Sequence, residues 1–424
     1  MSGKELPWFL TISIALNQPP GSSEPASRAG RLVSLDALRG FDMFWIIGAD
    51  ALVYALNRMS QTGPTRFLAD QLEHVAWEGF HFYDLIFALF VFIVGASLVF
   101  SLNRTIDEHG RATAVRRVIR RSVLLFVLGI LYSGGLSQVW PNVRLMGVLN
   151  RIALAYFFAG LIYCWLRGRP RLLAGVTAAL LTGYWILLQF VPFPDVRPDP
   201  GSNLTISKET GFTNVTQLNF AGRGILRGTY AEGVNLANYI DQRWLPGRKY
   251  DGTWDPEGLL STLPAVASCL TGVLAGLLLL GSTIRPLRKV AWLMASGAVA
   301  VLLGFFCGQP VIKKIWTSSF VLVTSGYSAM LLGTFYLVID VWDHRRWCQP
   351  LVWMGMNSIT VYLANEVVGG FDSVAARLVG GSVKGFLDRQ ISPGMGELAI
   401  ALTGLCLAFG LVYFLHRRKI FLRV

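Results

Sequence analysis

Two histidines and an aspartate lie close together at the start of a long apolar stretch. His74 and His81 precede Asp84, which lies just inside that stretch. An imidazole can accept a proton near neutral pH, and a carboxylate on its second ring nitrogen fixes the tautomer and raises the basicity. His81 is one helical turn from Asp84, and His74 reaches the same carboxylate if the intervening segment folds back. The spacing fits a general base at either histidine, and it also fits a structural histidine.

Charged residues also occur within the preceding apolar stretch, where an ionised group is costly and usually functional. Asp36, Arg39 and Asp50 share one face of a regular helix over residues 36–57. We expect Asp36 and Arg39 to form an ion pair near the inner boundary. Asp50 lies farther out, nearer the level of His74, and is the better candidate for lining a polar cavity.

Two arginines, Arg144 and Arg151, lie two helical turns apart in a later apolar stretch. They cannot easily reach one membrane surface together, and a buried guanidinium requires an anionic partner. Asp36, Asp84 or a bound phosphate is the expected partner. Polar residues also gather at the outer ends of other stretches, as expected for a cavity open to that side. They are Asp255, Glu257, Lys313, Lys314, Trp316, Asn357, Asn365 and Glu366.

These residues must be positioned by helices that cross a membrane. The chain of 424 residues is 53% hydrophobic and 15% charged, and its mean hydropathy is +0.49. Ten apolar stretches are long enough to cross about 30 Å of hydrocarbon as helices. They are residues 36–57, 80–103, 119–136, 144–166, 171–192, 259–281, 288–308, 316–340, 349–368 and 396–415. The stretches are continuous rather than alternating, which excludes a β-barrel and predicts an all-α, polytopic membrane bundle of about ten helices.

Lysines and arginines cluster in every second short loop, which is typical of cytoplasmic loops. This pattern places both termini in the cytoplasm and His74 on the opposite side. We expect residues 1–30 to be a flexible cytoplasmic tail and residues 31–424 to form the membrane domain. The long loop 193–258 then lies outside, and its aromatic and acidic end is expected to form a partly ordered lid at the outer mouth.

The net charge of +13 does not indicate nucleic-acid binding, because the basic residues lie in short loops where they set orientation and contact anionic lipid. The sequence contains no P-loop, zinc-protease, nucleophile-elbow or Rossmann pattern. Its five cysteines form no Cys-x-x-Cys pair. We therefore expect neither a metal site nor structural disulfides.

The motifs of the chain, taken in order, resemble those of heparan-α-glucosaminide N-acetyltransferases and their bacterial relatives, over roughly residues 31–415. A set of motifs in the same order is far more specific than any one of them. They are Arg31-Leu-Val-Ser-Leu-Asp36-Ala-Leu-Arg39-Gly40, His74-x-x-Trp77-x-Gly79 with Asp84, Gly147-Val-Leu-x-Arg151, Trp254-Asp255-Pro256-Glu257-Gly258, Lys314-x-Trp316-Thr317-Ser318 and Gly355-Met356-Asn357-Ser358.

The resemblance implies transfer of an acetyl group from cytoplasmic acetyl-CoA to the amine of a terminal glucosamine on the periplasmic side of a bacterial inner membrane. The catalytic histidine of the family corresponds to His74. Two positions depart from the family pattern, since Asp50 stands where an asparagine is expected and Asn365 where a histidine is expected. Both departures bear on the acceptor more than on the acyl chemistry.

We expect His74 to remove a proton from the incoming amine, or to carry the acetyl group itself, while Asp84 orients its ring. The polyanionic nucleotide of CoA is expected at the basic inner rim, with the pantetheine arm threading between helices to the level of His74. The residues expected to bind the substrate are Asp50, Trp77, Asp255, Glu257, Asn357 and Glu366. Those expected to bind acetyl-CoA are Arg39, Arg116, Arg117, Arg120, Arg121, Arg144, Arg151, Lys314 and Ser318.

Other functions stay open at this point. A polar cavity between helices also fits an amino-sugar transporter, although no inverted repeat is visible. The acceptor could be a hydroxyl group of a cell-surface glycan. The sequence also leaves a homodimer open as the oligomeric state. A purely structural membrane subunit would leave the intramembrane charges unexplained.

Overall fold

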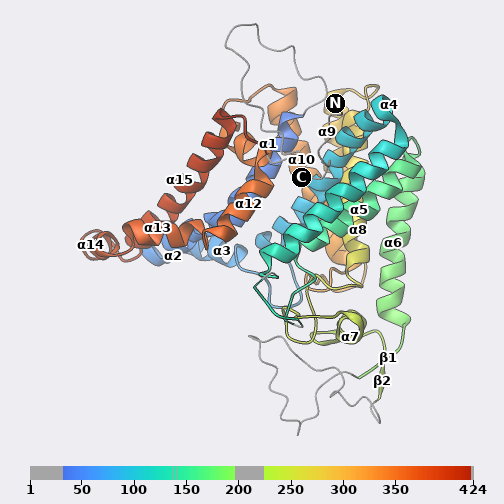
Figure 1. The fold of residues 1–424 in the computed structure, drawn as a ribbon, viewed down its shortest axis with the longest axis horizontal. Helices are drawn as coiled ribbons and strands as arrows, with labels where there is room; N and C mark the ends of the chain where they lie inside the picture. Colours follow the sequence, from blue (N-terminus) through green and yellow to red (C-terminus); the bar gives the residue numbers. More distant parts are fainter. Residues whose placement is uncertain (1–31, 136, 141, 196–223, 422–424) are drawn as a thin grey trace, which may run out of the picture.

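The computed structural model describes residues 32–135, 137–140, 142–195 and 224–421, and these form a bundle of helices with two short hairpins (Figure 1). The expected tail 1–30 lies outside the described residues. The helices are α1 (Val33–Phe44), the π-helical segment η1 (Trp45–Ala49), α2 (Asp50–Met59), α3 (Gly63–Gln71), α4 (Phe82–Tyr132), α5 (Val148–Leu166), α6 (Pro170–Phe190), α7 (Leu236–Trp244), α8 (Thr262–Leu280), α9 (Pro286–Phe306), α10 (Ser318–Phe335), η3 (Tyr336–Val341), α11 (Gln349–Met356), α12 (Ser358–Val367), α13 (Phe371–Val379), α14 (Ser382–Gln390) and α15 (Met395–Arg417). The predicted all-α membrane fold is confirmed.

The only strands in the described part of the chain belong to the long loop that follows α6. Strand β1 (Phe193–Pro194) pairs antiparallel with β2 (Ile225–Leu226), and β3 (Tyr230–Ala231) pairs antiparallel with β4 (Val234–Asn235). These hairpins and α7 lie together at one end of the bundle (Figure 1). The predicted outer loop is therefore folded over that end in residues 193–195 and 224–258.

Seven of the described helices are long and apolar enough to cross a membrane: α4, α5, α6, α8, α9, α10 with η3, and α15. The protein is thus a multi-pass membrane protein, but its spans are arranged differently from the ten that the sequence predicts. Helix α4 covers two predicted spans and contains a non-helical residue, Gly110, with φ +81°. Leu98 and Val118 lie on either side of Gly110 and both contact Gly160 of α5. A straight helix would separate them by about 30 Å, so the chain folds back at Gly110.

The predicted spans 36–57 and 349–368 are each divided into shorter helices. The first is interrupted by η1, where Gly48 has φ +114°, and the second by Asn357 between α11 and α12. The expectation that Asp36 and Asp50 share a face of one regular helix is therefore wrong. A π-turn and a left-handed glycine change the rotation between the two positions, and the sequence spacing assumes a regular helix.

Contacts between loops sort them into the two ends that the alternating pattern predicts. At one end Arg167 forms an ion pair with Asp107. At the other end the indole N–H of Trp77 donates to the Tyr230 carbonyl oxygen, 2.8 Å away, and Arg58 of α2 pairs with Glu397 of α15. The grouping of the loops agrees with the predicted topology, whereas the assignment of one end to the cytoplasm stays a prediction.

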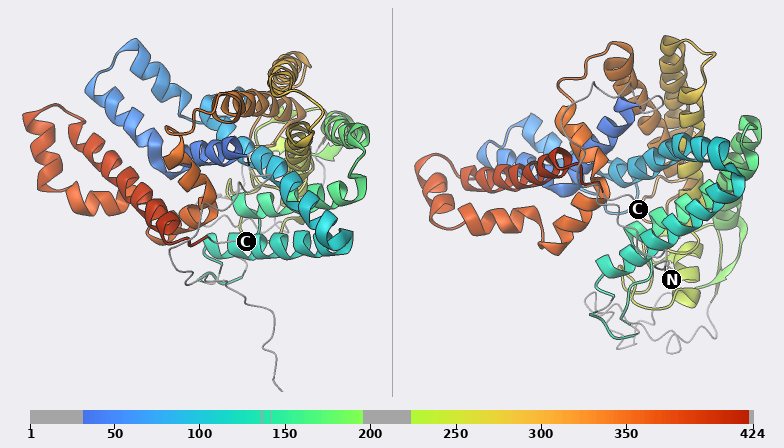
Figure 2. Two further views of the ribbon diagram at one scale, coloured as in Figure 1. Left: turned by 90° about the horizontal axis from the view of Figure 1, so that it is seen from above. Right: turned by 45° about the horizontal axis from the view of Figure 1, so that its top comes forward.

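Helices α2, α3, α13, α14 and α15 stand beside the main bundle rather than within it (Figures 1 and 2). The cores of both parts are apolar, with one cluster formed mainly by α4, α5 and α8 and another by η1, α11 and α15. The site described below lies where α1, α4, α5 and α12 approach one another.

Glycines allow close contact between helices α4 and α8. A Cβ atom at Gly272 of α8 would lie 1.9 Å from the carbonyl oxygen of Phe92 in α4, and one at Gly95 of α4 would lie 1.9 Å from that of Cys269. The backbones of α4 and α8 therefore touch directly, as small residues permit in membrane bundles.

We predict that Gly272→Ala destabilises the protein because the new methyl group forces α4 and α8 apart, at a cost of about 1–3 kcal/mol or more. Gly175→Ala on α6, where no atom lies within 4 Å of the new Cβ, is the matched control and should leave stability unchanged or raise it slightly. Thermal unfolding of the detergent-solubilised variants measures the difference. Equal melting temperatures for the two variants would contradict the close approach of the helices.

Candidate active site

Two loops from distant parts of the chain pair with each other at the outer end predicted above. Glu78 and Ile312 form an isolated antiparallel bridge, and the Gly79 N–H donates to the Val311 carbonyl oxygen at 2.9 Å. Gly79 has φ +130°, a conformation that a residue with a side chain rarely adopts. This glycine therefore lets the segment after His74 turn and pair with the loop that follows α9.

The second loop is anchored by Trp316, which is 1% exposed. Its indole N–H donates to the Ser268 hydroxyl of α8 at 3.0 Å, and the Arg151 guanidinium lies 4.9 Å from the centre of its ring. Trp316 has φ +51°, which is strained for a bulky residue and persists only where its surroundings hold it. The buried indole holds the residues before it in place.

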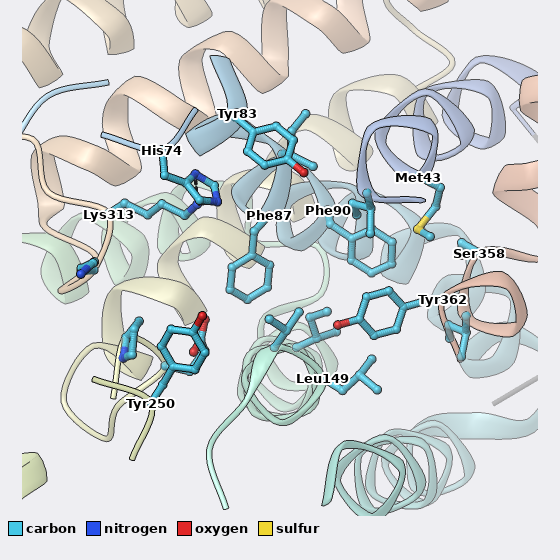
Figure 3. Close-up of a pocket in the computed structure, with 18 of the residues that line it drawn as sticks. Met43, His74, Tyr83, Phe87, Phe90, Leu149, Tyr250, Lys313, Ser358 and Tyr362 are labelled. Carbon is cyan, nitrogen blue, oxygen red and sulfur yellow. Dashed lines mark hydrogen bonds between the residues drawn. The ribbon is translucent and has the colours of Figure 1, made fainter. Parts of the chain in front are cut away.

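The paired loops bring His74, Asp84 and Lys313 together, and Figure 3 shows His74 beside Lys313. His74 Nδ1 lies 2.8 Å from Asp84 Oδ1, and Lys313 Nζ lies 2.9 Å from His74 Nδ1, 3.2 Å from His74 Nε2 and 3.4 Å from Asp84 Oδ1. The other Asp84 oxygen accepts from the backbone N–H groups of Val75 and His81. A carboxylate held in this way accepts the Nδ1 proton, so Nε2 carries the lone pair of neutral His74.

The alternative pair of His81 with Asp84 is not formed by the side chains. His81 Nδ1 lies 3.0 Å from the Glu73 carbonyl oxygen, and only the His81 backbone contacts the carboxylate. Of the two histidines that the spacing allowed, His74 is therefore the one paired with Asp84.

A cavity of about 410 Å³ opens beside His74, a volume within the usual range of small-molecule sites. Its polar part is formed by His74, Lys313 and the end of the long loop, and its other part is lined mostly by apolar side chains and runs between helices (Figure 3). The polar lining residues are His74, Tyr83, Arg144, Tyr250, Glu257, Lys313, Lys314, Ser358 and Tyr362. The apolar ones are Met43, Ile46, Val75, Ile86, Phe87, Phe90, Val148, Leu149, Ile152, Pro256 and Ile359.

Arg144, four residues before the start of α5, binds the end of the long loop that covers the cavity. It makes two hydrogen bonds of 2.8 Å to Asp255 and one of 2.7 Å to Glu257, while Tyr250 lies 4.9 Å from its guanidinium. The expected partners Asp36 and Asp84 are wrong for Arg144. The end of the long loop folds back onto α5 and supplies both carboxylates, a contact that depth along the spans cannot indicate.

Burial raises the pKa of Glu257 to about 7, and the neighbouring Asp255 carboxylate adds to this shift, while Arg151 and Arg144 oppose it. Two carboxylates that share one arginine cannot both ionise without cost. Glu257 therefore has a pKa near neutrality while it lines the cavity next to His74.

Lys314, in the loop after α9, binds the same part of the long loop. Its ammonium lies 3.1 Å from Glu232 and 3.3 Å from Asp251, and 5.5 Å from the ring of Trp254. Trp77 packs edge-on against Trp254 with ring centres 5.7 Å apart. The described end of the long loop is thus held over the outer mouth, as the sequence predicts for a partly ordered lid.

Several predicted site residues reach the cavity directly or through one neighbour. His74, Arg144, Glu257 and Lys314 line it. Asp50 forms a hydrogen bond with Tyr83, whose ring lies 4.8 Å from that of His74.

Other predicted site residues do not line the cavity but lie next to residues that do. Glu366 forms a hydrogen bond with Tyr132, which stacks on Tyr362 at 4.7 Å. Asn357 is buried at the helix break and donates to the Trp353 carbonyl oxygen, next to the lining residue Ser358.

The arginines expected to bind CoA at the inner rim lie away from this cavity. Arg117 donates to the Thr105 hydroxyl at 2.8 Å, and the Arg121 guanidinium lies 4.8 Å from the ring centre of Tyr156. Arg39 contacts Asp36 at 3.3 Å, as predicted. None of the residues expected to bind CoA lines the cavity except Arg144 and Lys314. Those that do not are Arg39, Arg116, Arg117, Arg120, Arg121, Arg151 and Ser318.

The predicted catalytic, substrate-binding and acetyl-CoA-binding residues omit five of the polar lining residues: Tyr83, Tyr250, Lys313, Ser358 and Tyr362. Lys313 directly precedes the motif that begins at Lys314, and that proximity was the available signal. Tyr83 directly precedes Asp84 of a quoted motif, whereas Tyr250 and Tyr362 lie outside the motifs, so only the folded chain identifies those two.

We predict a pH-dependent loss of stability that depends on Asp241 of α7. Burial raises the pKa of Asp241 to about 7, above its usual value of about 3.9 in an unfolded chain. The folded state therefore holds the proton more tightly, and this contribution to stability is lost as pH rises from about 4 through about 7. Asp241→Asn should flatten the dependence of the melting temperature on pH over that interval, and the exposed Asp70→Asn should not. Parallel curves for Asp241→Asn and the unchanged protein would contradict the prediction.

The chain as a whole is similar to known N-acetyltransferases. Residues 31–197 match the family model described as heparan-alpha-glucosaminide N-acetyltransferase, catalytic. The chain is 28% identical to the human heparan-alpha-glucosaminide N-acetyltransferase over 83% of its own length and 56% of that protein, and 28% identical to the mouse protein over 70% and 50%. It thus spans about half the length of these relatives. The resemblance carried by the motifs is thereby confirmed, and residues 31–197 are similar to the catalytic part of heparan-alpha-glucosaminide N-acetyltransferases.

Proposed function

We propose that the protein is a membrane-embedded acetyltransferase that moves an acetyl group from acetyl-CoA to the amine of a glucosamine-type sugar, with His74 as the general base. The observation that carries the proposal is the pairing of His74 with Asp84 at 2.8 Å beside a cavity with one polar and one apolar part. The relatives named as N-acetyltransferases support the reaction type.

The chemistry requires a base because an amino sugar is mostly an ammonium near neutral pH and has no lone pair in that form. His74 Nε2 is free of the contact to Asp84 and can accept the amine proton. The amine nitrogen then attacks the thioester carbonyl carbon, and the sulfur leaves as the thiolate of CoA. The protonated imidazole can return its proton to this thiolate, while Asp84 stabilises the imidazolium. The second proton, which the nitrogen loses as the amide forms, then passes through neutral His74 to water.

The apolar part of the cavity fits the pantetheine arm, which is long and only modestly polar. Arg144 and Lys314 are the two residues that line the cavity and that the sequence assigned to CoA. Both are already paired with carboxylates. Paired cations attract a polyanion weakly. We therefore place the nucleotide of CoA at the basic loops of the opposite end, with Arg116, Arg117, Arg120 and Arg121 as its binding residues.

The polar mouth is then the binding site of the acceptor. Glu257 and the hydroxyl of Tyr250 line it, and both can form hydrogen bonds with a sugar. On this proposal the mouth faces the periplasm of a bacterial inner membrane, and acetyl-CoA enters from the cytoplasm.

We predict that His74→Ala lowers the rate of acetyl transfer by about 10²–10⁴-fold, the usual contribution of a general base. His81→Ala is the matched control, because the His81 side chain contacts the Glu73 carbonyl oxygen and does not line the cavity. The measurement is formation of N-acetylglucosamine by full-length protein in proteoliposomes with acetyl-CoA. Full activity of His74→Ala, with an unchanged melting temperature, would refute the assignment.

Two further outcomes separate the alternatives. Labelling of the protein by radioactive acetyl-CoA in the absence of sugar would show that His74 carries the acetyl group rather than acting only as a base. Counterflow of labelled glucosamine without acetyl-CoA would indicate a transporter instead.

A further inference from the structure

Lys313 touches both members of the His74–Asp84 pair, yet general-base chemistry needs only the pair. Its ammonium nitrogen lies 2.9 Å and 3.2 Å from the two ring nitrogens of His74 and 3.4 Å from Asp84 Oδ1. The side chain lines the cavity and is 23% exposed. A cation in this position must affect any reaction that takes place at His74.

Lys313 Nζ lies about equally far from the two ring nitrogens of His74. Because Nδ1 is paired with Asp84, Nε2 is the ring nitrogen that carries the lone pair of neutral His74. The proton acceptor and a cation are presented to the cavity side by side (Figure 3).

Lys313 differs from the other two described cations that line the cavity. Arg144 is shared between Asp255 and Glu257, and Lys314 lies between two further carboxylates. In the described part of the chain, the one carboxylate within 4.0 Å of Lys313 is Asp84, which also binds His74. Its charge is thus the least neutralised of the three.

The backbone around Lys313 is also held in place. Ile312, the residue before it, pairs with Glu78 of the first loop, and the Ile312 N–H donates to the Thr317 hydroxyl at 3.1 Å. Buried Trp316 lies three residues after it. A side chain on such a fixed segment can offer a charge to a reacting group without rearrangement.

We propose that Lys313 is a catalytic residue whose ammonium stabilises the oxyanion of the acyl-transfer reaction. When the sugar amine bonds to the carbonyl carbon of an acyl thioester, the π electrons of the carbonyl move to its oxygen, and the ammonium donates a hydrogen bond to that oxygen. As the oxyanion collapses, the carbonyl re-forms and the carbon–sulfur bond breaks, leaving a thiolate. His74 takes the amine proton, and Lys313 keeps its own. This assignment rests on the proposed acetyltransferase function.

The charges around Lys313 also determine its titration. Burial lowers the pKa of Lys313, and the facing Asp84 and Glu257 carboxylates oppose that change, while His74 lies against it. The ammonium must be present for catalysis, so activity is expected to fall at high pH as Lys313 loses its proton. An arginine keeps its charge at any working pH.

We predict that Lys313→Met lowers kcat by about 10²–10³-fold, the loss seen when one oxyanion donor is removed, and leaves the KM for acetyl-CoA nearly unchanged. Lys313→Arg should keep measurable activity, and its decline at high pH should move to higher pH. Full-length proteins in proteoliposomes are assayed with acetyl-CoA and glucosamine across a pH series. Lys384→Met is the control, because it removes a cation on α14 that is paired with Asp388, away from the cavity. This variant should match the unchanged protein. Melting temperatures confirm that all variants fold.

Several outcomes would overturn the assignment. Lys313→Met with normal kcat would refute it outright. A raised KM at unchanged kcat would mean that Lys313 binds the substrate only, and a displaced pH profile with the same maximal rate would mean that it only tunes His74. If the unchanged protein acetylates no amino sugar, the proposed function fails and this assignment fails with it, which is distinct from an active protein that ignores Lys313.

Discussion

The antiparallel contact between Glu78 and Ile312 is the interaction on which the arrangement of the site depends. One partner follows His74 and precedes α4, whereas the other precedes Lys313 and lies between α9 and α10. A backbone hydrogen bond contributes only about 0.5–1.5 kcal/mol, but this one sets the register between the two loops. A displacement of about 1 Å can cost a large factor in rate. The bridge therefore matters for position more than for stability.

Buried charge maintains the geometry behind that bridge. Arg151 is fully buried, and it contacts the Ser261 hydroxyl and the ring of Trp316. Removing the Arg151 side chain would leave a cavity beside Trp316 and take one partner from the Ser261 hydroxyl, and both changes are destabilising. Arg151, which sequence reasoning assigned to CoA, thus supports the anchor of the Lys313 loop. Arg151, which stabilises the fold, is therefore connected through Trp316 to Lys313, which faces the cavity.

The sequence predicts well whatever depends on local pattern and poorly whatever depends on contacts across the bundle. Apolar length predicted the membrane helices, and spacing predicted the pairing of a histidine with Asp84. The prediction of one regular helix over residues 36–57 was wrong at Gly48, because a π-turn changes the rotation per residue without changing the apolar pattern. The partners of Arg144 lie more than 100 positions away in a polar loop, so neither spacing nor depth could identify them.

The charge balance at the mouth bears on which substrate meets the protein there. Carboxylates outnumber cations among the described groups that meet at the mouth, since Arg144 and Lys314 each contact two of them. On the proposed function, this balance favours an ammonium-bearing sugar at the mouth over the phosphates of CoA. An acyl donor bound at this end would have to overcome this charge balance, whereas one that enters from the basic loops at the other end would not. On the proposed function, the mostly apolar part of the cavity is the route by which an uncharged thioester reaches His74, because its apolar lining disfavours the charged nucleotide.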